Sequence, residues 1–240
     1  MKKVLLFFMF LALTAGAFAQ VSFGPKVGMT LSKYGYNYSS AYEFMEPEVN
    51  FKPGPQLGVM MDLQILEFLW FQPSLMYSKK GVSFDVAEFE SGEAVITGYD
   101  RVKISYLELP LNLALGLKLG PVRFQVFAGP YFAYAIAGKN VWDYEENDGG
   151  IRTDITGSSD FEFVGEIPDD HKDDIAYQRP FDAGVDFGLG FQVNKVLLNL
   201  GFAMGFANLQ PEKSGTDFDA SDYKYANRTI FINAAWLFGK

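Results

Sequence analysis

Eight segments of this chain alternate large apolar side chains with small or polar ones at every second residue. Such alternation is typical of β-strands whose two faces meet different surroundings, and no stretch sustains the 3.6-residue period of a helix. Each segment is long enough for a tilted strand to cross a bilayer, which takes about 9–11 residues. The eight predicted strands occupy residues 22–31, 54–65, 69–78, 102–115, 122–136, 181–193, 196–206 and 230–238.

The fourth segment changes its phase near the middle. Val102, Ile104 and Tyr106 occupy one parity, whereas the leucines from Leu107 to Leu115 occupy the other. A β-bulge inserts one residue into a strand and thereby shifts the alternation by one position. We therefore expect a bulge near Tyr106 that keeps one apolar face along the whole strand.

The connections between the segments alternate between short and long. Short connections lie at 66–68, 116–121 and 194–195, and long ones at 34–52, 80–100, 138–178 and 208–227. This pattern is typical of a membrane barrel with short periplasmic turns, long extracellular loops and an even number of antiparallel strands. Alternating apolar residues within the second and third long connections, such as Phe84 and Phe161, indicate that some strands continue above the membrane.

The residues between the large apolar ones decide which face of the barrel is outside. A soluble eight-stranded barrel, such as a lipocalin, would bury the apolar set and expose the other. That other set is mostly Gly, Ala, Ser, Asn and Gln, with too few Lys and Glu residues for a water-exposed surface. Small side chains fit the narrow lumen, and the apolar set fits lipid. The sequence therefore predicts an all-β, eight-stranded antiparallel up-and-down transmembrane β-barrel.

The first 19 residues have the pattern of a cleaved secretory signal peptide. Lys2 and Lys3 precede an apolar run at 4–13, and Ala17-Phe18-Ala19 forms a cleavage site before Gln20. The run is too short for a helix that crosses a hydrocarbon core of about 30 Å. We expect residues 1–19 to be removed and residues 20–240 to form one barrel domain in the outer membrane.

Acidic residues predominate, and most of them lie in the long connections. Without Lys2 and Lys3 the chain carries 18 basic and 29 acidic residues, and the four long connections hold 24 of the acidic ones. Nucleic acid, which needs clustered Lys and Arg, is therefore not an expected partner. We expect the loops to meet a protein partner or the envelope. The third loop could gather divalent cations through its carboxylates, although residues 143–150 lack the EF-hand order of ligands.

The sequence offers little catalytic chemistry. His171 is the only histidine and lies in an acidic loop sequence, where a solvated histidine is expected. No pair of carboxylates stands out as acid and base, and the absence of cysteine excludes disulfides and thiolate metal sites. Eight-stranded barrels are filled by side chains, so an open diffusion pore is not expected. We predict a non-catalytic barrel without a cofactor. Two alternatives stay open: a component of an export or uptake assembly, and an outer-membrane enzyme at the barrel rim.

Seven charged residues fall within the predicted strands, in the phase of the small side chains once the bulge near Tyr106 is allowed. A basic side chain on the lipid face costs about 2–4 kcal/mol at the bilayer midplane, and buried charges need partners. We therefore predict an ionic network in the lumen, with Lys26 and Asp62 as the adjacent pair. Its members are Lys26, Asp62, Lys103, Glu108, Arg123, Asp182 and Asp186.

Four segments also resemble a known family. They read YLELPLNL at 106–113, AGPYFAY at 128–134, FDAGVDFGLGF at 181–191 and RTIFINAAWLF at 228–238. These segments resemble the PorT-like family of small, porin-like outer-membrane β-barrels that is abundant in Bacteroidetes. The resemblance covers the second half of the barrel better than the first and leaves the long loops unmatched. It implies the fold and the location, but no activity, because fold analogy does not transfer function.

Overall fold

The structure is a computed structural model that describes residues 20–38, 49–91, 94–148, 150–170, 174–213 and 223–239. The predicted signal peptide at 1–19 and His171 lie outside the described residues. Within them, no helix has the length and apolar character needed to span a membrane. The strands are β1 (Gln20–Tyr38), β2 (Asn50–Leu66), β3 (Leu69–Ser91), β4 (Ala94–Leu119), β5 (Val122–Asp148), β6 (Ile151–Phe163), β7 (Glu166–Ile167), β8 (Ala176–Gln178), β9 (Phe181–Val193), β10 (Val196–Gly205), β11 (Glu212–Lys213) and β12 (Tyr223–Trp236).

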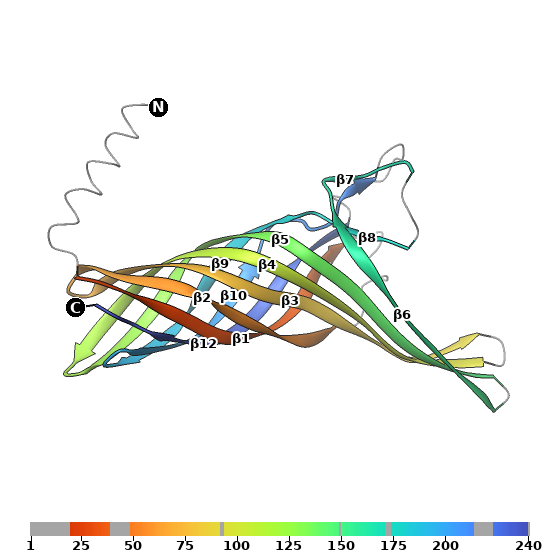
Figure 1. Ribbon diagram of the computed structural model, residues 1–240, viewed down its shortest axis with the longest axis horizontal. Coiled ribbons are helices and arrows are strands. Elements are labelled where there is room, and N and C mark those ends of the chain that lie inside the picture. Colours follow the sequence, from red (N-terminus) through yellow and green to blue (C-terminus); the bar gives the residue numbers. More distant parts are fainter. Residues whose placement is uncertain are drawn as a thin grey trace.

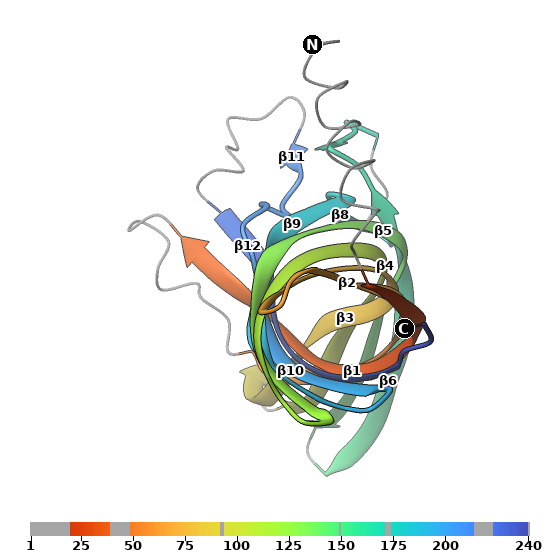
Figure 2. The same cartoon turned by 90° about the vertical axis from the view of Figure 1, so that its left-hand side faces the viewer.

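Eight of these strands close into one barrel, which confirms the predicted fold. The ring order is β1, β2, β3, β4, β5, β9, β10 and β12, and β12 pairs with β1 to close it. Every neighbouring pair in the ring is antiparallel. Figure 2 looks into the barrel and shows the strands around its axis. Closure leaves no sheet edge in the bilayer, where unpaired backbone groups cost several kcal/mol each.

The large apolar side chains cover the outside of the ring. Val27, Leu115 and Leu189 are 57%, 53% and 62% exposed, whereas inward polar residues such as Thr30 and Asn199 are buried. An apolar outside and a polar inside are the arrangement of a membrane barrel and the reverse of a soluble one. The prediction that the large apolar set faces lipid and the small set faces the lumen is therefore confirmed.

The phase change predicted for the fourth segment does not occur in β4. Val102, Ile104 and Tyr106 are buried inside the barrel, and β4 keeps one alternation throughout. The bulge lies in the partner strand, because the register shifts after Ser105 and leaves Ile136 as the extra residue of β5. The expectation that the three residues belong to the outward face was wrong. They pack in an apolar cluster inside the barrel, so apolar character alone does not identify the lipid face of this strand.

Three strands of the ring, β3, β4 and β5, extend furthest beyond the length that crosses a membrane. β4 has 26 residues and β5 has 27, whereas a tilted transmembrane strand needs about 9–11. Their outer halves stay paired with each other, with β3 on one side and β6 on the other. Figure 1 shows this part leaving the barrel at the end opposite the C-terminus. We call residues 84–91, 94–100, 142–148 and 151–157 the outer sheet.

We expect trypsin added to intact cells to cut after Arg152 and to spare Lys195. Arg152 lies near the tip of the outer sheet with 70% of its side chain exposed, whereas Lys195 lies in the tight turn between β9 and β10. Exposed tips are preferred sites of proteolysis, and the short turns of membrane barrels face the periplasm. Mass spectrometry of the fragments measures the orientation, and cleavage after Lys195 alone would reverse it.

Candidate functional site

A bidentate ion pair crosses the lumen near the end that carries the short turns. The Arg123 guanidinium donates to the Asp62 carboxylate at 2.9 and 3.2 Å, and both residues are buried. Gln72 donates a further hydrogen bond to Asp62 at 2.8 Å, and the guanidinium carbon lies 4.4 Å from the centre of the Trp70 ring. A cavity of about 200 Å³ at this end of the barrel is lined by Asp62, Trp70 and Arg123. We call Asp62, Trp70, Gln72 and Arg123 the lower network.

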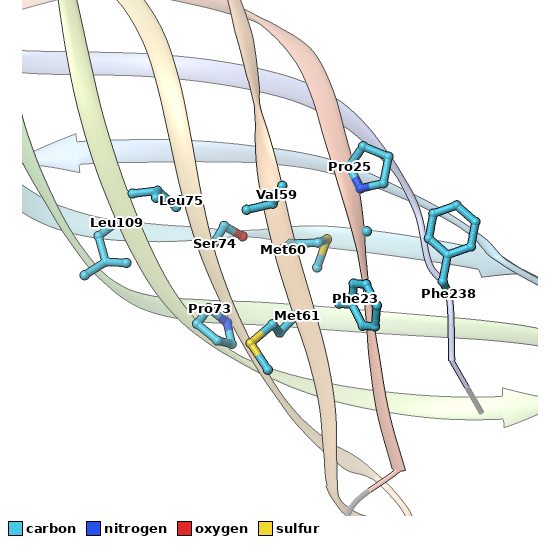
Figure 3. Close-up of a pocket in the computed structure, with 11 residues that line it drawn as sticks. Phe23, Pro25, Val59, Met60, Met61, Pro73, Ser74, Leu75, Leu109 and Phe238 are labelled. Carbon is cyan, nitrogen blue, oxygen red and sulfur yellow. The ribbon is translucent and has the colours of Figure 1, made fainter.

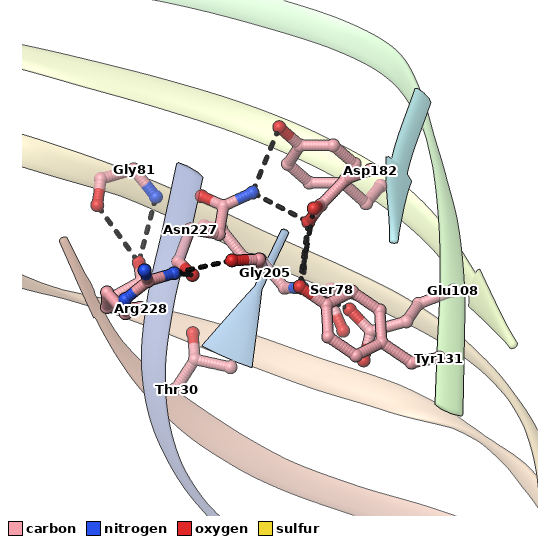
Figure 4. A network of polar contacts seen from close by, with 12 residues as sticks. Thr30, Ser78, Gly81, Glu108, Tyr131, Asp182, Gly205, Asn227 and Arg228 are labelled. Atoms are coloured by element: carbon pink, nitrogen blue, oxygen red, sulfur yellow. Dashed lines mark hydrogen bonds and ion pairs between the residues drawn. The ribbon is translucent and has the colours of Figure 1, made fainter. Parts of the chain in front are cut away.

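A second group of charges, the upper network, lies further along the lumen. The Lys80 ammonium on β3 lies 2.5 Å from Glu108 on β4 and 3.7 Å from Asp182 on β9, and all three residues are buried. Asn227 donates to Asp182 at 2.8 Å, and the Tyr131 hydroxyl donates to the same carboxylate at 3.2 Å. Figure 4 shows Glu108, Tyr131, Asp182 and Asn227 projecting toward one another. One cation therefore faces two carboxylates, of which Asp182 also accepts neutral hydrogen bonds.

The upper network continues to a buried amide beyond the ring strands. The Tyr34 hydroxyl on β1 donates to Gln178 at 2.9 Å, and the Gln178 amide donates to the Tyr106 hydroxyl on β4 at 2.8 Å. Gln178 belongs to β8, in the connection that returns from the outer sheet, and is completely buried. The returning chain thus places a side chain inside the barrel between β1 and β4.

Aromatic rings fill the lumen between the two networks. The ring centres of Phe127 and Phe231 lie 6.2 Å apart, and a Cβ at Gly201 would clash with the Phe231 ring. Glycine at this position therefore leaves room for the ring. A cavity lined by Phe231, Lys26 and Asp186 has a volume of about 10 Å³, roughly the room that one water needs. Side chains thus occupy this level of the barrel.

Six of the seven charged residues predicted to face the lumen are buried inside the ring. Lys103 is exposed on the outer face of β4, and its predicted orientation was wrong. That prediction depended on a bulge in β4, and the bulge lies in β5 instead. The buried residues are Lys26, Asp62, Glu108, Arg123, Asp182 and Asp186, each at most 6% exposed.

Lys26 and Asp62 do not form the expected pair. Asp62 lies opposite Ser22 on β1, so Lys26 is four residues further along that strand, or about 13 Å at roughly 3.3 Å per residue. The Lys26 ammonium instead lies 3.4 Å from the Ser74 hydroxyl. The pairing was wrong because distance from the strand ends does not determine the register of two strands.

Lys80 is the residue of the network that sequence reasoning missed. Ending the third segment at Ser78 assigns Lys80 to a long connection, although it keeps the inward parity of the preceding residues. β3 in fact continues to Ser91. Two signals could have found Lys80: the unbroken alternation, and the need of Glu108 and Asp182 for a buried cation.

A groove of about 630 Å³ opens on the outer surface between β1, β2 and β3. The register of β2 against β3 is incomplete at this level, and Pro25 and Pro73 cannot donate backbone hydrogen bonds. Figure 3 shows Phe23, Met60 and Met61 among its apolar lining, with the hydroxyl of Ser74 as a polar exception. This lining suits an acyl chain of the surrounding lipid and holds no acid or base.

The described part of the third long connection contains paired charges. Arg152 lies 3.5 Å from Glu145, and Lys139 lies 3.9 Å from Asp160. Such exposed pairs contribute only about 0–1 kcal/mol each. Among the residues that the structure describes, no three His, Asp or Glu side chains gather in a way that could hold a metal ion. The divalent-cation hypothesis therefore has no site within these residues.

The closed ring, its apolar outside and its filled polar lumen define an outer-membrane β-barrel protein. Residues 18–210 match the model of the outer membrane protein beta-barrel domain family, so the chain belongs to that family and is placed in the outer membrane. Comparison with curated proteins finds no match.

Two solved structures match this chain at low sequence identity. The attachment invasion locus protein Ail of Yersinia pestis is 10% identical, with 91% of this chain and 99% of Ail covered and a TM-score of 0.35. Neisserial surface protein A is 11% identical, with 92% of this chain and 99% of that protein covered and a TM-score of 0.31.

Proposed function

We propose that this protein is a closed, non-catalytic outer-membrane barrel that presents its outer sheet to a protein partner at the cell surface. The outer sheet itself is the observation that carries the proposal. Three ring strands, β3, β4 and β5, stay paired far beyond the length that a membrane crossing requires, and β6 pairs with the outer part of β5. Fixing the backbone of one residue costs about 1–2 kcal/mol of conformational entropy. A regular sheet is already ordered, so its side chains are held in one arrangement before a partner binds.

The surface of the outer sheet suits a partner with an apolar centre and a basic rim. Ile151 and Ile155 are 73% and 41% exposed near the tip of β6. Five acidic residues lie in the outer-sheet parts of β5 and β6, and Arg152 is the basic residue among them (Asp143, Glu145, Glu146, Asp148 and Asp154). Exposed apolar residues within a charged surround mark interaction sites, and opposite charge steers the partner.

The interior supports the non-conducting part of the proposal. The lower network, the aromatic rings and the upper network follow one another along the lumen. Eight strands give a lumen that side chains fill, whereas aqueous channels need about 16. The same buried groups are engaged with one another, so they offer no free acid and base to a substrate.

The narrower resemblance to the PorT-like family is compatible with this role. In the segment at 106–113, Glu108 and Asn112 are buried in the lumen while the leucines between them face lipid. The segment therefore supplies both the lipid-facing side chains of the barrel wall and the side chains that fill the lumen. Export through a cleaved peptide at 1–19 belongs to the same proposal. The alternative of an export or uptake assembly would need the partner to remain bound stoichiometrically in detergent.

Site-specific photocrosslinking in growing cells tests the proposal. The photoreactive amino acid p-benzoylphenylalanine replaces Ile151 at the outer sheet, and a matched variant carries it at Leu198, which is 47% exposed on the barrel wall. We expect a protein adduct from position 151 and none from position 198. Equal adducts from both positions, or none from 151 in a folded barrel, would contradict a partner at the outer sheet.

A further inference from the structure

Five basic side chains gather on the outer surface of the barrel, where the strands leave the apolar belt. The Lys33 ammonium lies 5.2 Å from the centre of the Phe51 ring. Lys79 and Lys103 are exposed on the neighbouring strands β3 and β4, where Lys79 pairs with Ser105 and Lys103 pairs with Gly81. We call these residues of β1 to β4 the basic band: Lys33, Lys52, Lys79, Arg101 and Lys103.

The basic band surrounds a polar groove of about 550 Å³. Lys52, Arg101 and Lys103 line it together with Phe51, Ser83 and Asp85. The register of β2 against β3 shifts between Phe51 and Gln56, and beyond this shift Lys52 lines the same groove as the outward residues of β4. The groove therefore draws cations from two strands that are not adjacent in the ring.

The band lies directly above the lipid-facing belt. On β1 the outward face changes from Leu31 to Lys33 within two residues, and on β3 it changes from Tyr77 to Lys79. On β4 it changes from Leu107 to Lys103 across one intervening outward residue. Aromatic and basic side chains at such a boundary are typical of the level of the lipid headgroups.

The positive charges of the band outnumber the one carboxylate, that of Asp85, which lines the groove with them. Within the described ranges, none of the five forms an ion pair. Arg101 stacks on the Tyr99 ring at 3.7 Å, and the Asp85 carboxylate in the groove accepts a hydrogen bond from Asn50 at 2.7 Å. Like charges held close together repel one another, so an external anion would stabilise the cluster.

We propose that the basic band binds the phosphate groups of an anionic lipid in the outer leaflet. Lysine binds phosphate as a point charge, and arginine binds it through its planar fork. The apolar belt immediately below the groove gives the acyl chains of the same molecule a contact surface, which a free phosphate would not use. This inference concerns the barrel wall and stands apart from the partner proposed for the outer sheet.

A titration with lipid tests the proposal. The protein is folded in zwitterionic detergent micelles, and dioleoyl phosphatidic acid is added while the unfolding temperature is measured, since a ligand of the folded state raises it. Each Lys or Arg near an anionic surface contributes about fivefold in affinity. We expect Lys52→Gln/Lys103→Gln to raise the half-saturating lipid concentration about 25-fold. Lys52 is partly buried and Lys103 is exposed, and neither forms an ion pair with another described residue, so the variant should fold, which circular dichroism checks.

A matched pair of lysines at the other end of the barrel serves as the control. Lys118→Gln/Lys195→Gln removes the same charge near the periplasmic turns and should leave the half-saturating concentration within about twofold. An equal loss in this control, or no loss in the band variant, would overturn the proposal. Inorganic phosphate is added in a separate arm. If it stabilises the protein as strongly as the lipid does, the band is a site for free anions and the lipid assignment is wrong.

Discussion

Replacing Lys80 with methionine is expected to lower the free energy of unfolding by about 3–5 kcal/mol. Lys80 is the cation between Glu108 and Asp182, and all three side chains are at most 4% exposed. Its removal leaves two buried carboxylates without the cation that lies within 4 Å of both. Because total stability is typically about 5–15 kcal/mol, the loss should be visible in urea unfolding of the barrel in phospholipid vesicles, followed by tryptophan fluorescence.

Two further variants separate charge from the loss of packing. Lys224→Met removes an exposed lysine of β12 and should change stability by less than about 0.5 kcal/mol. Adding Glu108→Gln and Asp182→Asn to Lys80→Met removes the unpaired charges and should restore most of the lost stability. If Lys80→Met unfolds like Lys224→Met, the upper network does not hold the barrel together.

Replacing Asp62 with alanine should produce the second large loss, about 3 kcal/mol or more. The change leaves the Arg123 guanidinium buried without the carboxylate that accepts both of its hydrogen bonds. It also removes the acceptor of Gln72. The same urea measurement applies, and Asp160→Ala, which removes an 84% exposed carboxylate of β6, is the control.

The partner of Asp62 can be identified from double variants. Asp62→Ala/Arg123→Met should be more stable than Asp62→Ala alone, because no unpaired charge remains. Asp62→Ala/Lys26→Ala should show no such recovery, since Lys26 lies about four residues away along β1. Recovery with the lysine change, and none with the arginine change, would mean that Asp62 pairs with Lys26 and not with Arg123 in the lumen.

The strand count and the two faces of the barrel could be predicted because both depend on local alternation. One residue of slip exchanges the apolar and polar sets, so the pattern from Val27 to Leu31 or from Leu107 to Leu115 fixes the orientation of each strand. The short turns are equally local. Burial of Asp62, Glu108 and Arg123 follows from the same parity.

Contacts across the lumen could not be predicted, because they depend on register, tilt and bulges. The pairing of Asp62 on β2 with Arg123 on β5 joins strands that are separated by two others in the ring. The orientation of Lys103 depended on where one extra residue lies, and Ile136 of β5 takes that place. The pairing across the lumen and the position of the bulge depend on the closed sheet as a whole, so the alternation within one segment does not predict them.

The extent of the outer sheet was indicated only in part. Phe84 and Phe161 continue the alternation into the predicted loops, but the acidic residues around them favoured irregular, solvated segments. The acidic segments nevertheless form strands, because each outer strand is paired with its neighbour up to Ala94 and Asp148. Charged side chains are compatible with antiparallel strands above the membrane because such strands can expose a face to water.

The conductance of the purified protein tests the central claim, a barrel closed by its own side chains. In planar bilayers under an applied voltage, we expect no steady current, because Arg123, Phe127 and Lys80 occupy successive levels of the lumen. The Asp62→Ala/Arg123→Met variant, which keeps the rings and the upper network, should also be silent. A steady, porin-sized current from the unmodified protein would contradict a closed lumen.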